Sequence, residues 1–177
     1  MAGEHLKAHA RRVVIGLDDD GKSSIVSDGH TQTRLATEAY TLNQIWQATS
    51  VPSPAMAENT LGDEAVIPPP PAGYTYVITT FPPDSEWDYE AGYARALAEA
   101  GAADSVGPDD PPGMHRTDTI DIVTVISGEI WALVETGETL LKPGDTLVQR
   151  ATKHAWQNRS TTPCTIAALH VAVTAEQ

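Results

Sequence analysis

Short runs of β-branched and aliphatic residues, separated by glycine, proline and aspartate, follow one another along most of the chain. Residues 12–27 form two such runs around Asp18-Asp-Asp-Gly21, which predicts a β-hairpin with a tight turn. Two further strands are predicted at 41–48 and 74–81. Past residue 113 the runs recur at regular intervals, which is typical of a β-sandwich or a closed barrel. We expect these later strands at 114–119, 120–126, 129–135, 138–141, 145–149, 154–158 and 164–173.

A single segment has the pattern of a helix. Ser85 can cap it, acidic residues suit its first turn, and Gly101 can end it. The sequence therefore predicts one helix between Ser85 and Gly101, with Trp87, Tyr93 and Leu97 as its buried side chains. The acidic, Gly- and Pro-rich stretch at 102–113 is expected to be a surface loop that could cover the entrance of the barrel.

The length of 177 residues and the 41% apolar content fit one globular domain with its own core. We divide residues 1–177 into N-terminal strands and loops (1–83), helix and acidic loop (84–112) and a core of strands (113–177). The net charge of -13 disfavours nucleic acid and anionic membranes as partners. Because no apolar leader or run of eighteen apolar residues is present, we expect a cytoplasmic protein.

Three residues stand out as candidate metal ligands or catalytic groups: His115, Asp121 and His154. Imidazole and carboxylate are common donors for divalent transition metals. His115, Thr117 and Asp121 have the same parity, so an unbroken strand would point them to one face. Inward residues of neighbouring barrel strands converge, so His154 could complete a set of two histidines and one carboxylate.

Two segments carry a family resemblance. Residues 114–129, Met-His-Arg-Thr-Asp-Thr-Ile-Asp-Ile-Val-Thr-Val-Ile-Ser-Gly-Glu, resemble the first cupin motif. The segment from Lys142-Pro-Gly-Asp to His154-Ala-Trp-Gln-Asn158 resembles the second. With the N-terminal hairpin, the chain is similar to small single-domain bacterial cupins.

The resemblance implies an all-β fold, a cupin jelly-roll β-barrel with an N-terminal hairpin extension and one short helix before the motif strands. Carried over by position, His115 and His154 match two family histidines, and Asp121 replaces the family glutamate. Thr117 falls where the family has its second histidine, so the metal motif is degenerate. The resemblance gives the architecture but not the substrate.

Other interpretations of these residues stay open. The histidine pair could be structural, and Asp121 could form an ordinary ion pair with Arg116 or Arg150 in a barrel without metal. The remaining histidines, His5, His9, His30 and His170, lack motif neighbours and are interpreted as surface or structural residues. The predicted substrate pocket consists of Thr117, Val123, Val125, Trp131, Arg150 and Trp156.

The first functional hypothesis is a metal-dependent enzyme for a small organic substrate, of the oxygenase, isomerase, decarboxylase or dehydratase type. His115, Asp121 and His154 would hold iron, manganese, nickel or zinc. An alternative is a metal-free dehydratase or decarboxylase in which a histidine is the general acid or base and Asp121 orients its imidazole. A second alternative is a barrel that binds a small ligand without turnover. We also expect a homodimer in which the N-terminal hairpin lies across the partner's sheet.

Overall fold

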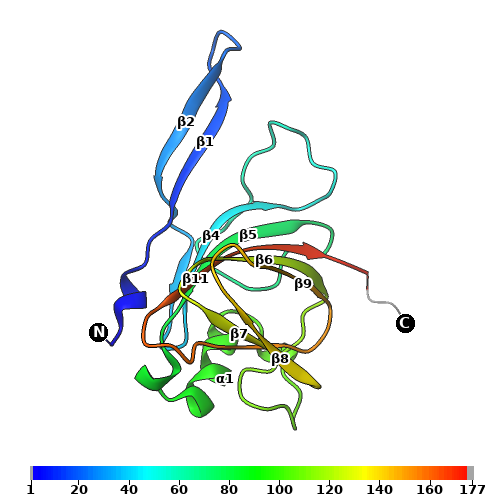
Figure 1. The fold of residues 1–177 in the computed structure, drawn as a ribbon. Helices are drawn as coiled ribbons and strands as arrows, with labels where there is room; N and C mark the ends of the chain where they lie inside the picture. Colours follow the sequence, from blue (N-terminus) through cyan, green and yellow to red (C-terminus); the bar gives the residue numbers. More distant parts are fainter. Residues whose placement is uncertain (1, 175–177) are drawn as a thin grey trace.

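The computed structural model describes residues 2–174 and consists of two packed β-sheets, one α-helix and a separate β-hairpin (Figure 1). Strands from the first and last thirds of the chain pair in the larger sheet. The core therefore depends on contacts between residues that are far apart in the sequence. The strands are β1 (Arg11–Leu17), β2 (Ser23–His30), β3 (Arg34–Ala36), β4 (Thr41–Ala48), β5 (Tyr74–Phe81), β6 (Thr119–Ser127), β7 (Ile130–Val134), β8 (Gly137–Leu141), β9 (Thr146–Arg150), β10 (Ala155–Gln157) and β11 (Cys164–Ala172).

The larger sheet has six strands in the order β3-β4-β5-β11-β6-β9. Its central strand, β11, is antiparallel to both β5 and β6. On β6 the burial alternates strictly from Thr119 to Val125, as expected for a strand with one face on a core and one toward solvent. The buried face of this sheet lines the interior, and β11 places its own alternate residues beside those of β6.

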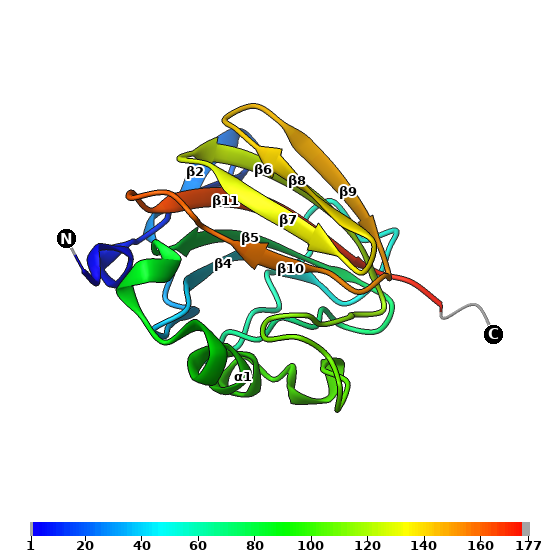
Figure 2. The same cartoon turned by 60° about the horizontal axis from the view of Figure 1, so that its bottom comes forward.

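The smaller sheet has the order β10-β7-β8 and packs over the larger one (Figure 2). The chain changes sheet between β6 and β7, between β8 and β9, and at both ends of β10. Repeated crossing between two antiparallel sheets is the topology of a jelly roll. The predicted all-β jelly-roll fold with a hairpin extension and one short helix is therefore confirmed.

The helix α1 (Tyr89–Glu99) packs against strands of both sheets (Figure 2). Tyr89 Oη donates a hydrogen bond to the carbonyl of Trp156 in β10, at 3.1 Å. On the other side, Tyr40 Oη donates to the carbonyl of Ala96 in α1, at 2.7 Å. The helix thus closes one side of the sandwich, and its predicted buried residues Tyr93 and Leu97 do face the core.

The predicted start of the helix is three residues too early. Ser85 lies in a separate 3-10 turn, η2 (Asp84–Glu86), and Trp87 after it is extended. The cap is Asp88, whose carboxylate accepts a hydrogen bond from the Ala91 amide at 3.2 Å. Two further 3-10 turns are η1 (Glu4–Lys7) and η3 (Ala103–Ser105).

The expected strand at 114–119 is reduced to a single bridge, and the short strand β3 was not predicted. His115 exchanges both main-chain hydrogen bonds with His154, each at 3.0 Å. The next amide, that of Arg116, donates instead to Ser105 in the preceding loop. Pairing with a loop rather than a strand ends the ladder at this point.

The β1–β2 hairpin extends away from the two sheets (Figure 1). Its apolar side chains remain exposed, with Ile15 at 69% and Ile25 at 64% of full exposure. Because Ile15 lies opposite Ile25, both side chains are on one face of the hairpin. Within residues 2–174, no helix has the length and apolar character needed to span a membrane.

Candidate functional site

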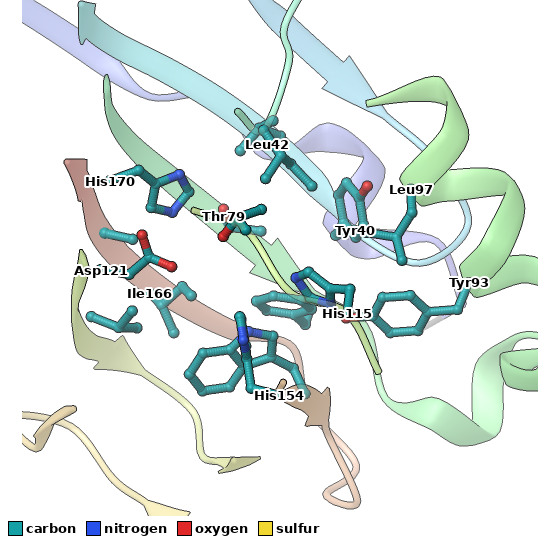
Figure 3. A pocket seen from close by; sticks show the side chains of 16 residues that line it. Tyr40, Leu42, Thr79, Tyr93, Leu97, His115, Asp121, His154, Ile166 and His170 are labelled. Atoms are coloured by element: carbon teal, nitrogen blue, oxygen red, sulfur yellow. The ribbon is translucent and has the colours of Figure 1, made fainter. Parts of the chain in front are cut away.

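A cavity of about 60 Å³ lies between the inner face of the six-stranded sheet, β10 and helix α1 (Figure 3). Aliphatic and aromatic side chains form most of its wall. One acidic residue lines it, and no lysine or arginine does. The polar and titratable side chains of its lining, tyrosines aside, are Thr79, His115, Thr117, Asp121, His154 and His170.

The bridge between His115 and His154 places their imidazoles side by side. The ring centroids are 4.4 Å apart and the rings are tilted by 49°. Each residue is 6% exposed. Trp156 meets the His154 ring edge-on at 5.9 Å, so the histidine pair lies against an aromatic wall.

Main-chain carbonyls fix the tautomer of both rings. His115 Nδ1 lies 2.8 Å from the carbonyl oxygen of Gly113, and His154 Nδ1 lies 3.1 Å from that of Thr152. A carbonyl oxygen only accepts, so Nδ1 must carry the proton in each neutral ring. Nε2 of each ring is then a lone-pair acceptor, and no side chain or main-chain group of the described residues hydrogen-bonds to it.

Burial keeps both imidazoles neutral at neutral pH. It lowers the pKa of His154 to about 3, and the neighbouring His115 adds to this because two cations would repel each other. Burial also lowers the pKa of His115, but the Gly113 carbonyl and the negative charge of Asp121 oppose this effect. His115 is therefore the one of the two that has a carboxylate to stabilise an added proton.

Asp121 lies on the buried face of β6 and is 5% exposed. Its Oδ1 is buried and has no hydrogen-bond partner within residues 2–174. The expected alternative pairing with arginine does not occur: Arg116 binds Asp118, and Arg150 is on the exposed face of β9. Asp121 does not orient the imidazoles either, because carbonyls hold their Nδ1 atoms.

The donor types of His115, Asp121 and His154 suit a divalent transition metal, but their arrangement does not. In the part of the chain that the structure describes, no three histidine, cysteine, aspartate or glutamate side chains are placed to hold one ion. The imidazoles lie together, whereas Asp121 is beside His170 in Figure 3. The residues present therefore do not form a ready metal centre.

The predicted pocket residues divide into two groups. Thr117, Val123 and Trp156 line the cavity. Trp131 and Arg150 do not line it, because each points to the outer face of its strand. Trp131 lies between the buried Ile130 and Ala132 on β7, and Arg150 follows the buried Gln149 on β9. Val125 is on the inward face of β6 but is packed in the core, away from the cavity.

His170 was missed as a site residue, and it lines the cavity directly opposite Asp121 in the register of β11 and β6. The expectation that it is a surface or structural residue is corrected by this placement. A signal for it was present in the sequence. Cys164, Ile166 and Ala168 form the buried face of β11, and strand alternation places His170 on the same face.

The two carbonyls that hold the imidazoles belong to loops that are tied together. Lys153 Nζ binds Asp110 Oδ1 at 2.6 Å, which joins the loop before His115 to the loop before His154. Gly113 has φ +79°, and a Cβ there would lie 2.8 Å from Tyr89 Oη. Only glycine suits this conformation and this space, so Gly113 is needed to present its carbonyl to His115.

Comparison with known proteins gives local similarity to fungal biosynthetic proteins. The chain is 52% identical over 50 residues to phomopsin biosynthesis cluster protein C' of Diaporthe leptostromiformis, covering 28% of this chain and 26% of that protein. It is 52% identical over 52 residues to oryzines biosynthesis cluster protein J of Aspergillus oryzae, covering 29% of each. The matched region thus spans between a quarter and a third of these relatives. No protein-family model matches the chain.

Among solved structures, the chain is similar to the cupin domain of Cnp3 from Schizosaccharomyces pombe. The two are 10% identical, with a TM-score of 0.47, and the match covers 94% of this chain and 89% of that one. The jelly-roll fold itself follows from this chain's own strand order.

Proposed function

We propose that the protein is a small-molecule enzyme that catalyses proton transfer, with His115 Nε2 as the general base. The observation that carries the proposal is the fixed tautomer of the histidine pair. Two neutral rings present Nε2 lone pairs inside an apolar cavity, and carbonyls bind both Nδ1 protons. A buried, oriented imidazole of this kind is a common general base.

His115 is the base rather than His154 because a proton on His115 is stabilised by Asp121. The pKa of His154, at about 3, makes that ring a weak base. Its Nε2 instead accepts a hydrogen bond from a hydroxyl or N–H of the substrate and so orients it.

The reaction class is dehydration or isomerisation. His115 Nε2 takes a proton from a carbon next to a carbonyl group. The same proton then passes to a leaving hydroxyl, which departs as water, or to another carbon, which isomerises the substrate. Decarboxylation is less favoured because no lysine or arginine lines the cavity to hold a carboxylate.

The local similarity to fungal biosynthesis cluster proteins supports a role in the synthesis of a small molecule. The predicted metal-dependent reaction stays a second possibility. The unpartnered Oδ1 of Asp121 favours it, while the separation of the donors does not. The experiment below distinguishes the two.

The test uses 4-hydroxy-2-butanone, a small β-hydroxyketone, in D₂O with a chelator present. Deuterium exchange at the carbon between the carbonyl and the hydroxyl-bearing carbon, and loss of water, are followed by proton NMR. Wild type is expected to accelerate both, and His115→Gln to lose about 10²- to 10⁴-fold of the rate.

His9→Gln is the matched control, since His9 is exposed and lies outside the cavity. The rate in this variant should equal that of wild type. No acceleration by folded wild type, or equal rates in His115→Gln and wild type, would contradict the proposal. Activity that appears only after a divalent metal replaces the chelator would favour the metal-dependent alternative.

A further inference from the structure

The charge of the cavity lining restricts which molecules can enter it. Asp121 is the only acidic residue in its lining, and no lysine or arginine accompanies it. A carboxylate or phosphate group placed beside Asp121 would be repelled by it and would find no lysine or arginine to pair with. Anionic substrates are therefore disfavoured at this site.

The hydrogen-bonding character of the site points in the same direction. Asp121 Oδ1 is buried without a partner, and Nε2 of His115 and of His154 can only accept while the rings are neutral. A buried acceptor that lacks a donor is costly, and the cost is greater for a carboxylate than for a neutral group. A ligand that brings both donors and a positive charge would remove this cost.

His170 is the titratable side chain that faces Asp121 from the neighbouring strand. Figure 3 shows these two side chains on one side of the His115–His154 pair, with Tyr93 and Leu97 on the opposite side. The cavity thus has a carboxylate at one end and the reactive histidine pair further along it, with aliphatic residues such as Val123 and Ile166 in its wall.

The size of the cavity limits the ligand. About 10–15 Å³ of this kind of volume is needed for one water molecule. A cavity of about 60 Å³ accommodates a group of about four to six non-hydrogen atoms. The part of the ligand that is enclosed is consequently small.

We propose that the cavity binds a small primary amine in its ammonium form, with Asp121 as the counter-ion at one end and the reacting carbon near His115 at the other. This inference rests on the proposed function for the identity of the reactive end. The ammonium group donates to the carboxylate of Asp121, and the short alkyl chain contacts the aliphatic wall.

The test compares three probes of matched chain length: propylammonium, 1-propanol and propanoate. Binding to the full chain is measured by NMR titration at about pH 8 with a chelator present, where ordinary imidazoles are neutral. Propylammonium is expected to bind at least tenfold more tightly than propanol, and propanoate not at all.

Asp121→Asn keeps the shape of the side chain and removes its charge. It should weaken propylammonium binding about tenfold or more and leave propanol binding unchanged. Asp118→Asn is the control, because Asp118 is exposed and pairs with Arg116 outside the cavity. Its binding of all three probes should match wild type.

Equal binding of propanoate and propylammonium to wild type would overturn the amine proposal, whether or not the Asp121 variant folds. Unchanged propylammonium binding in a folded Asp121→Asn would also overturn it. Because these are binding measurements, they stand apart from the deuterium exchange that tests His115 as the base.

Discussion

At the scale of single residues, the site depends on which ring nitrogens of His115 and His154 are not hydrogen-bonded to the main chain. The carbonyls of Gly113 and Thr152 bind Nδ1, so Nε2 is the reactive atom of both rings. Burial removes positive charge from the pair, because the cationic form of each ring is poorly solvated there. The same burial that makes the rings neutral should also make the protein sensitive to acid.

This sensitivity has a definite sign for His154. Its pKa is about 3 in the folded protein and 6.5 for an ordinary histidine, so the unfolded chain binds more protons between these values. The free energy of unfolding should therefore fall as the pH drops below 6.5. The slope is about 1.4 kcal/mol per pH unit, or roughly 2 kcal/mol between pH 6.5 and 5.

Urea denaturation at several pH values measures this loss. His154→Gln lacks the titrating group and should lose less stability over the same range than wild type does. His9→Gln, changed at an exposed position, should follow wild type. Identical pH dependence in His154→Gln and wild type would show that His154 takes up its proton as easily folded as unfolded.

The sequence predicted His115, His154 and Asp121 as residues of one site from strand parity and from their positions in the two motifs, and all three line the cavity. It failed for Trp131 and Arg150, since moving one residue along a strand moves a side chain to the opposite face. His170 was missed because it belongs to neither motif, although the alternation along β11 places it on the buried face. Its role depends on its register with Asp121, which no local pattern contains.

At the scale of elements, the two loops before the histidines act together. Lys153 reaches Asp110, and the main chains of His115 and His154 pair with each other nearby. The β-branched residues of segment 114–119 predict a strand. In the structure, however, the Arg116 amide donates its hydrogen bond to Ser105 in the preceding loop. Local propensity predicts a strand, but the available partner decides whether one forms.

Lys153→Met should loosen this pair of loops, because it removes the charge that Asp110 binds while keeping the aliphatic stem. We expect faster hydrogen–deuterium exchange at the amides of His115 and His154, which donate to each other's carbonyls. Lys22→Met, at the distant hairpin turn, should leave both amides unchanged. Exchange at wild-type rates in Lys153→Met would mean that the ion pair does not hold the loops.

At the scale of the whole molecule, the β1–β2 hairpin pairs with no third strand among residues 2–174. A two-stranded hairpin alone is marginally stable in water, and this one exposes Ile15 and Ile25 on one face. The outer face of the larger sheet exposes Ile122 and Val148. The expected homodimer, with the hairpin of one chain across the sheet of the other, remains a prediction that both surfaces favour.

Sedimentation at micromolar concentration tests it. Wild type should sediment with twice the monomer mass, and the double change Ile15→Ser with Ile25→Ser should shift it toward the monomer. Val134→Ser alters a comparably exposed residue on the smaller sheet and should leave the dimer intact. A monomeric wild type would exclude this assembly.

The position of β11 in the sheet has a consequence for how the protein is made. This strand joins β5 to β6, yet it follows both of them in the chain. Until residues 164–172 have emerged, the two halves of the larger sheet share no hydrogen bonds and their edges are open. Co-translational folding of the larger sheet is therefore delayed until β11 has left the ribosome, and the nascent chain needs protection from aggregation until then.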